Sequence, residues 1–416
     1  MPRSVVLHAA DLHLDAPFEN VGRTPPQVAA ALRDAALATW DALVDLAIAR
    51  EVAAVLLAGG LCGGIERGVR TQARLRDGLA RLCARGIRAF VALGERDPPL
   101  AGFGAVGEWP EGVTVFPAGA WGTEVLTHAG AALATVHGIS AAPQRGAALP
   151  ELRVAGADLP TPHLAVCQSA LVGHAADDGS VTACPPADLR GAGVDYWALG
   201  HAHALDYPST GAPWIVYPGR PQGRGLAAEE CGPKGVVLVE IDSGAVTRVD
   251  FEPIDRVRCL RVELRDAPDP AGLVELLSAR AAALREHQLG RALVLDARVG
   301  GAAGASHALC QPAARAELLA ALRRVAEPWE PFVWWAGVRR LPSARSGEPV
   351  GDDLAAEVER HRSLLAADGE LRARFFARRF EPLRDAWTAD IDPPEASALL
   401  DEAAAVAIDA LHEDGS

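Results

Sequence analysis

The stretch "LLAGGLCGG" at residues 56–64 decides how the first half of this chain folds. It completes the apolar segment "VAAVLLA" at 52–58, which predicts a buried strand, and its glycines predict a loop directly after that strand. A loop at this place in an α/β enzyme commonly carries a reactive side chain. Here the glycines supply neither a metal ligand nor a group that can transfer a proton.

Strand-like and helix-like segments alternate on both sides of this loop. The longer helix begins with Thr24 and Gln27 at the spacing of a capping box, and Pro25 suits its first position. Such alternation predicts parallel strands joined by crossover helices. The patterns give strands at 4–10, 52–58 and 87–93, and helices at 24–51 and 66–85.

The rest of the chain has a different organisation. Between about 110 and 245, short strands follow one another with few long helices, which predicts a second, mixed or antiparallel sheet. We therefore expect an α/β sandwich of two sheets between helical layers at 1–250. Residues 256–342 alternate strand, helix, strand, helix and strand, which predicts a small α+β domain. The stretch "SARSGEP" reads as a linker into a polar, mostly helical tail at 343–416.

Composition limits the class of protein. A chain of 416 residues is longer than one hydrophobic core usually supports, so we expect two or three domains. A formal charge of −14 excludes nucleic-acid binding through the overall field, so any DNA contact needs a local basic surface or a partner. No apolar run reaches the roughly 18 residues of a membrane span, and the N-terminus lacks a signal-peptide core. The seven cysteines are scattered without a CxxC pair, which favours reduced thiols and a cytoplasmic location.

Polar residues follow several of the predicted strands, where ligands of open α/β sheets bind. They are Asp11, His13 and Asp15 in "DLHLD", the tetrapeptide "GERD" at 94–97, Gln168, and His201 and His203 in "GHAH". Residues i and i+2 of extended chain point to the same side, so we expect Asp11 and His13 to face one crevice, and likewise His201 and His203. Carboxylate and imidazole groups gathered in this way are typical of a metal site.

Five stretches together resemble the calcineurin-like metallophosphoesterases, and more closely the SbcD-type DNA repair exonucleases of the YhaO-like branch. The stretches are "HAADLHLDAPF", "LLAGGLCGG", "ALGERD", "DYWALGHAHALDY" and "WIVYPGRPQGR…GPKGVVLVEI". The resemblance covers essentially the whole chain and implies a phosphoesterase domain, a small α+β capping domain and a helical tail. It also implies two divalent ions, typically manganese, which activate a water and hold a DNA phosphate between them.

This chain departs from the family pattern at the positions that contact metal or transfer a proton. The family's DxH motif is present as Asp11 and His13, and its GHxH motif as Gly200, His201 and His203. Gly60 stands where the resemblance implies the carboxylate that bridges both ions, and Gly63 stands at the second acidic position. Glu95 and Arg96 replace the Asn ligand and the catalytic His of the GNHD motif, and Gln168 replaces a His ligand.

The resemblance therefore implies a remnant of the two-metal site. One ion would keep Asp11, His13 and His203, while the other would keep only His201. Two readings stay open: a single Mn, Fe or Zn ion at the first group, or no ion at all. Glu95 could reach toward the second position. Arg96 and Arg220 could contact a phosphate, or Arg96 could pair with Asp97 or Glu95 and fill the space left by the metal.

The family resemblance also implies partners. Its tail helices dock on the root of an SMC-like coiled-coil ATPase (SbcC in the SbcD family), and its members form homodimers. The segment "LRARFFARRF" at 371–380, with Trp387 beyond it, is the candidate for docking here, or it packs on its own domain. We thus expect a degenerate subunit that serves as a scaffold, with a single-ion DNA exonuclease or phosphoesterase and a binder of small phosphates as alternatives.

Overall fold

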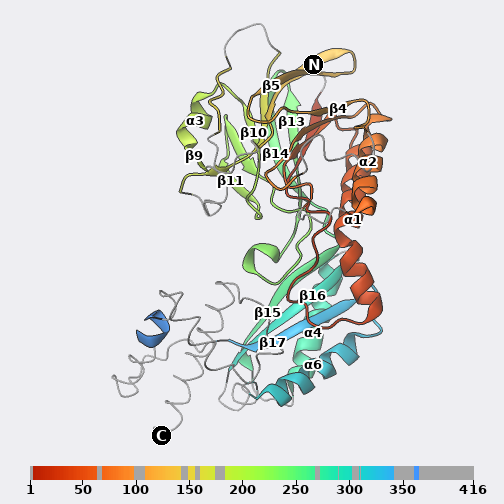
Figure 1. The fold of residues 1–416 in the computed structure, drawn as a ribbon. Helices are drawn as coiled ribbons and strands as arrows, with labels where there is room; N and C mark the ends of the chain where they lie inside the picture. Colours follow the sequence, from red (N-terminus) through yellow and green to blue (C-terminus); the bar gives the residue numbers. More distant parts are fainter. Residues whose placement is uncertain are drawn as a thin grey trace. The chain divides into compact units, whose positions relative to one another are not determined.

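The structure is a computed structural model, and the chain divides into two compact units (Figure 1). One unit comprises Met1–Leu260, Leu284–Leu295 and Pro328–Ala336, and the other comprises Arg261–Ala283, Asp296–Glu327 and Gly337–Ser416. The residues described are 3–62, 68–97, 108–141, 149–154, 160–173, 183–267, 272–288, 290–301, 309, 311–341 and 360–364.

The first sheet of the first unit has the order β14-β13-β1-β2-β3-β4, with β1 to β4 parallel and β13 antiparallel to both of its neighbours. Its outer face packs against two helices through a buried cluster that includes Trp40, Leu43 and Leu79 (Figure 1). The strands are β1 (Ser4–Ala9), β2 (Ala54–Ala58), β3 (Arg88–Ala92), β4 (Val113–Val115), β13 (Gly235–Asp242) and β14 (Ala245–Pro253). The helices are α1 (Pro26–Ala49) and α2 (Val69–Cys83).

The second sheet has the order β11-β12-β10-β7-β6-β5, with a parallel centre and an antiparallel strand at each edge. Its strands are β5 (Gly122–His128), β6 (Ala131–Ile139), β7 (His163–Gln168), β10 (Tyr196–Gly200), β11 (Asp206–Ser209) and β12 (Trp214–Tyr217). Helix α3 (Pro186–Gly191) covers its outer face through Leu189. A short ladder of β8 (Ala170–Leu171) and β9 (Ala183–Cys184) follows β7, and a 3-10 turn η2 (Ala228–Glu230) precedes β13.

The two sheets pack face to face. Val6, Leu56 and Phe90 of the first sheet lie in one buried cluster with Leu164 and Tyr196 of the second. All five side chains are completely excluded from solvent. The expected α/β architecture with two packed sheets is thereby confirmed. Two strands expected in the second sheet, β4 and β13, lie instead in the first, and the antiparallel β13 makes that sheet mixed.

The five elements predicted at 256–342 are all present. The strands β15 (Val257–Ala267), β16 (Ala292–Gly301) and β17 (Val333–Arg340) form a three-stranded sheet in that order. Between them lie α4 (Leu273–His287) and α6 (Pro312–Ala326), whose few buried side chains are apolar, as an amphipathic pattern predicts. The linker and most of the tail, including the 371–380 segment, lie outside the described residues.

The prediction of a capping box at the start of α1 is wrong. Pro25 is the N-cap residue, Pro26 takes the first helical position, and no side chain caps the helix. Thr24 therefore lies one residue before the N-cap, where its hydroxyl is out of register with the orphan N–H groups.

Ion pairs join α1 and α2 on their solvent side. Arg70 Nη1 lies 2.9 Å from Asp34 Oδ1, Arg81 Nη2 lies 2.6 Å from Asp45 Oδ1, and Arg74 pairs with Asp41. Because these side chains are exposed, each pair contributes about 0.2–1 kcal/mol, and salt weakens it. We expect Arg81→Ala to lower the free energy of unfolding by less than about 1 kcal/mol in urea titrations, and by less still in 0.5 M salt.

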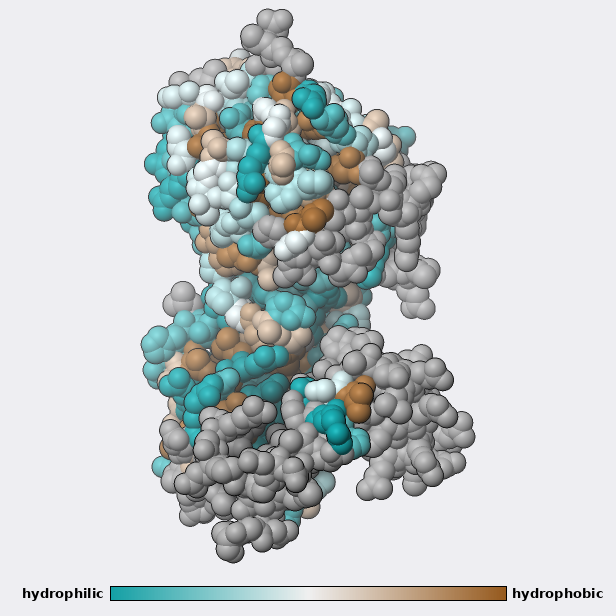
Figure 2. All heavy atoms as spheres, turned by 90° about the vertical axis from the view of Figure 1, so that its left-hand side faces the viewer, coloured by the Kyte–Doolittle hydropathy of each residue, from teal (hydrophilic) through white to brown (hydrophobic). Residues whose placement is uncertain are grey.

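Three further features of the molecule are its surface, the length of its helices and its cysteines. On the face shown in Figure 2, apolar side chains gather in small groups among hydrophilic ones. None of the helices in the described ranges has the length and apolar character needed to cross a bilayer. The six cysteines within those ranges form no disulfide bond, and Cys310 lies outside them.

Candidate functional site

The carboxyl ends of β1, β2, β3, β7 and β10 bring their loops together at one edge of the sandwich. Asp11 N donates to Gly59 O at 2.9 Å, and His13 N donates to Gly60 O at 2.8 Å, so the loops after β1 and β2 run side by side. The five strand ends identified from the sequence therefore meet, as the next contacts show.

Asp11 is the centre of this edge, with 1 % of its surface exposed. Its Oδ2 accepts a hydrogen bond from His201 N at 2.8 Å, and its Oδ1 accepts one from Gln168 Nε2 at 3.3 Å. Burial raises the pKa of Asp11 to about 7, against the opposing effects of the His201 hydrogen bond and of Arg220. Both oxygens are thus anchored to the second sheet, and the carboxyl group titrates near neutral pH.

The side chains of Asp11, His13 and His203 form a group whose ligand atoms all lie within 4.8 Å of one another. His13 Nε2 is buried without a hydrogen-bond partner and lies 3.9 Å from Asp11 Oδ1. Burial, reinforced by Arg220, lowers the pKa of His13 to about 2 and that of His203 to about 3. Both imidazoles are therefore neutral at pH 7, which is the form that binds a metal ion.

The donor set suits one divalent ion rather than two. Two imidazoles and one carboxylate are a common arrangement for a single Mn, Fe or Zn ion, and the unpartnered His13 Nε2 fits such a ligand. Against this, Arg220 Nη2 lies 3.0 Å from His203 Nε2. A guanidinium can only donate, so His203 Nε2 is the acceptor and its lone pair is already used. Within this group, a metal ion at that nitrogen would have to displace Arg220.

Gly60 leaves no room for the bridging carboxylate that the resemblance implies. Its φ of +66° lies in the left-handed region, which most side chains disfavour. A Cβ placed on it would lie 2.6 Å from Asp11 Oδ1 and 2.7 Å from Asp11 Cα. An acidic side chain at this position therefore requires the loops after β1 and β2 to separate. Gly63, the second position of the same motif, lies outside the described residues.

Gln168 fills the space between the loops after β2 and β3. Its Oε1 accepts a hydrogen bond from Glu95 N at 3.1 Å while its Nε2 donates to Asp11. A Cβ on Gly94 would lie well inside van der Waals contact with the Gln168 amide, so any other residue there would require that amide to move. The amide thereby connects three strand ends at the position where the resemblance implies a histidine ligand.

Asp97, the aspartate of the "GERD" loop, accepts hydrogen bonds from backbone N–H groups. Its Oδ1 accepts from Cys62 N at 3.0 Å and its Oδ2 from Gly94 N at 2.7 Å. Burial is the main cause that raises its pKa to about 6. Glu95 beside it is half-buried and Arg96 is exposed. Asp97 therefore holds the two glycine-containing loops against each other.

His201 lies outside the group formed by Asp11, His13 and His203, and its φ is +101°. Asp11 and His13 also have positive φ values, of 51° and 41°. The expectation that DxH and HxH lie in extended chain is thus wrong, because hydrogen bonds to the glycine loop and to Asp11 hold these residues in left-handed conformations.

Two residues beside Arg220 were not identified from the sequence. Glu230 is 7 % exposed, pairs with Arg220 Nη1, and accepts a hydrogen bond from Arg224 N at 2.8 Å. Arg224 is 8 % exposed, and its Nε is buried without a hydrogen-bond partner. The spacing of the two arginines in "GRPQGR" is visible in the sequence, but nothing local marks Glu230 as their partner.

Comparisons with known proteins bear on this site. The metallophosphoesterase YhaO of Bacillus subtilis (strain 168) is 32% identical over 247 residues, which are 58% of this chain and 58% of YhaO. The match thus spans less than two thirds of that relative, and no family model matches the chain. The crystal structure of TT1561 of Thermus thermophilus aligns with 12% identity and a TM-score of 0.37, over 61% of this chain and 100% of that one. Over the 247 matched residues the chain is therefore related to a metallophosphoesterase, YhaO.

Proposed function

We propose that the chain is a subunit descended from SbcD/YhaO-type nucleases of DNA double-strand-break repair, with a degenerate two-metal site. It serves as a scaffold or DNA-processing partner of an SMC-like ATPase. The observation that carries the degeneracy is Gly60, which packs against Asp11 where a bridging carboxylate is needed.

Two-metal hydrolysis depends on ligands that hold both ions close together. Without a shared carboxylate, two divalent ions a few ångströms apart repel each other strongly, because nothing between them carries the opposite charge. The neighbouring positions supply no substitute, since Gln168 is an amide and already bonds to Asp11 and Glu95. A guanidinium does not serve as a general acid, so Arg96 does not replace a catalytic histidine.

Two features support the proposed partners: the tail resembles the docking helices of SbcD-type proteins, and the chain carries a net negative charge. A chain of net charge −14 needs help to approach DNA, and a DNA-bound ATPase would provide it. The full chain is expected to copurify with a coiled-coil ATPase and to form a homodimer. Substituting Phe375 and Phe376 by Asp should abolish copurification. If no such ATPase is recovered with the unaltered chain, this part of the proposal fails.

A second candidate function is that of a single-ion phosphoesterase or DNA exonuclease. It is favoured by the group of Asp11, His13 and His203 with the unpartnered His13 Nε2. A single ion would supply Lewis-acid activation of a phosphate oxygen or of a water. Asp11 and the two neutral imidazoles would hold it, provided that Arg220 leaves His203.

Metal analysis and a nuclease assay separate these two functions. Protein purified in manganese is expected to hold much less than one ion per chain and to cleave single- and double-stranded DNA no faster than background. The variant His203→Ala should behave identically, as should His287→Ala, which alters an exposed histidine. Stoichiometric manganese together with cleavage that only His203→Ala abolishes would establish the single-ion enzyme instead.

A further inference from the structure

Arg220 occupies a position in which a cation is expected to bind. Its Nη2 donates to His203 Nε2 at 3.0 Å, which uses the lone pair that a metal ion would need. Its backbone N also donates to His203 O at 3.1 Å, so Arg220 contacts the same residue twice. The side chain is 14 % exposed, so this cation is part of the interior of the site.

Glu230 fixes the guanidinium in this position. Its Oε1 pairs with Arg220 Nη1, while its Oε2 accepts from Arg224 N at 2.8 Å. The carboxylate is therefore bound on both oxygens and holds the loop that carries the two arginines. A planar guanidinium held in this way keeps one orientation. Arg220 is thus a built-in cation, unlike a metal ion that can be lost.

Unused donors remain around this cation. The Nε atoms of Arg220 and Arg224 are buried without hydrogen-bond partners. Buried donors without partners are costly, and an oxyanion that accepts from them removes the cost.

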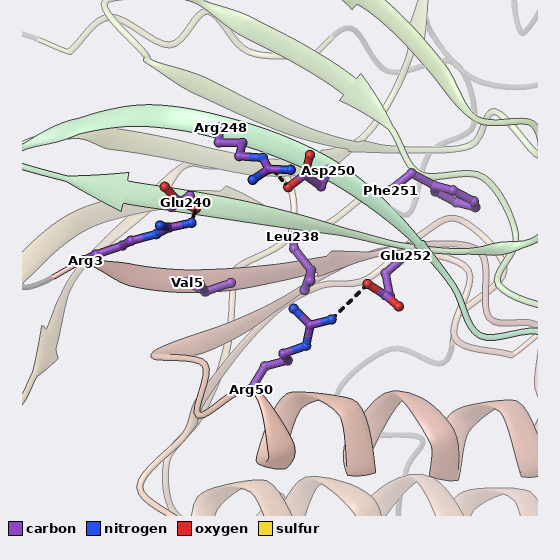
Figure 3. A pocket seen from close by; sticks show the side chains of 9 residues that line it. All are labelled: Arg3, Val5, Arg50, Leu238, Glu240, Arg248, Asp250, Phe251 and Glu252. Atoms are coloured by element: carbon purple, nitrogen blue, oxygen red, sulfur yellow. Dashed lines mark hydrogen bonds and ion pairs between the residues drawn. The ribbon is translucent and has the colours of Figure 1, made fainter.

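A second hollow of the same unit is also lined by arginines, but all of them are paired with carboxylates. A cavity of about 440 Å³ lies at β1, β13, β14 and the residue after α1 (Figure 3). Its three arginines are each paired with a carboxylate of the same hollow: Arg3 with Glu240, Arg50 with Glu252 at 3.2 Å, and Arg248 with Asp250 at 2.7 Å. The lining has as many acids as arginines, so it offers an anion no excess of positive charge.

We propose that the Arg220 guanidinium takes the place of a metal ion at His203 and that, with Arg224, it makes this edge a metal-independent site for a phosphate group. The proposal deepens the proposed function, because it names what a degenerate nuclease site still binds. The phosphate can belong to a DNA end or to a free phosphomonoester, which share the same oxyanion.

Calorimetric titration of the full chain in EDTA tests the anion site. Inorganic phosphate is expected to bind unaltered protein, and Arg220→Gln to weaken that binding at least about tenfold, since charge-assisted bonds are lost. Arg50→Gln removes the same charge from the paired hollow and should leave phosphate binding unchanged. Duplex DNA with a 5′-phosphate and a free 5′-mononucleotide then distinguish the two sources: a DNA-end site binds the phosphorylated duplex more tightly than the mononucleotide, and a phosphomonoester site does not.

Manganese affinity is expected to change in the opposite direction to phosphate affinity in the same variant. Equilibrium dialysis with manganese is expected to show gain of an ion at His203 in Arg220→Gln, by at least about tenfold in affinity, because the competing cation is gone. If Arg220→Gln fails to fold, the double variant Arg220→Met with Glu230→Gln removes both charges of the buried pair together and gives the same readouts.

The outcomes separate this inference from the proposed function. Phosphate binding that disappears in EDTA, or an Arg220→Gln variant that changes neither phosphate nor manganese affinity, would overturn the role of Arg220 even if the protein cleaves no DNA. Manganese-dependent cleavage would overturn the proposed function by a separate assay. Loss of phosphate affinity with gain of manganese affinity supports the inference.

Discussion

Replacing Gly60 by Asp is expected to lower the free energy of unfolding by roughly 2–5 kcal/mol and to restore no manganese-dependent cleavage. Two costs add up. A left-handed φ of +66° penalises any residue with a Cβ, and that Cβ would lie 2.6 Å from Asp11 Oδ1. The new carboxylate would also be buried beside the Asp11 carboxylate. Two neighbouring negative charges repel, so ionisation of both groups is disfavoured.

Gly86→Asp is the matched control for this experiment. Gly86 has a φ of +75°, close to that of Gly60, but a Cβ there meets nothing within 4 Å. Its substitution isolates the backbone cost, about 1–2 kcal/mol. Urea titration of both variants and a cleavage assay in manganese give the comparison. A Gly60→Asp protein as stable as Gly86→Asp, and active, would show that the site accepts a bridging acid after all.

The place of this loop in the fold could be predicted from the sequence. An apolar run such as 52–58 predicts a strand that is buried on both faces, and glycines after it predict a turn. The predicted strands and loops therefore agree with the structure to within a few residues. The strands and helices at 256–342 could be predicted equally well, because the helices bury only apolar side chains and apolar residues recur along the strands. These features depend on local composition and periodicity.

The contacts within the site depend on partners far apart in the chain. Nothing near Gln168 shows that its amide bonds to Asp11, 157 residues away, and nothing near Arg220 selects Glu230 rather than its neighbour Glu229. Left-handed conformations at Asp11, His13 and His201 were also invisible, because non-glycine residues adopt them only where tertiary hydrogen bonds compensate. The sequence therefore predicted which strand ends meet but not the backbone conformation of the residues that follow them.

His8 should make the fold sensitive to acid. Its side chain is completely buried between the sheets, with Nδ1 2.9 Å from the Tyr196 hydroxyl oxygen, and burial lowers its pKa to about 3. The unfolded chain binds a proton at this histidine below about pH 6.5, whereas the folded chain does not until about pH 3. Its contribution to stability is thus fully present above pH 6.5 and is lost as the pH falls.

Between pH 6.5 and 4.5 this single group should cost about 2–3 kcal/mol of unfolding free energy. Asp11 and Asp97, with raised pKa values, act in the opposite direction, and His13 and His203 act in the same one. The difference between variant and parent therefore isolates His8. We expect His8→Gln to remove about 2–3 kcal/mol from the pH dependence measured by urea titration, and His287→Gln, at an exposed histidine, is the matched control. Equal pH slopes in all three proteins would mean that His8 is protonated without cost, and that the layer between the sheets is open to water.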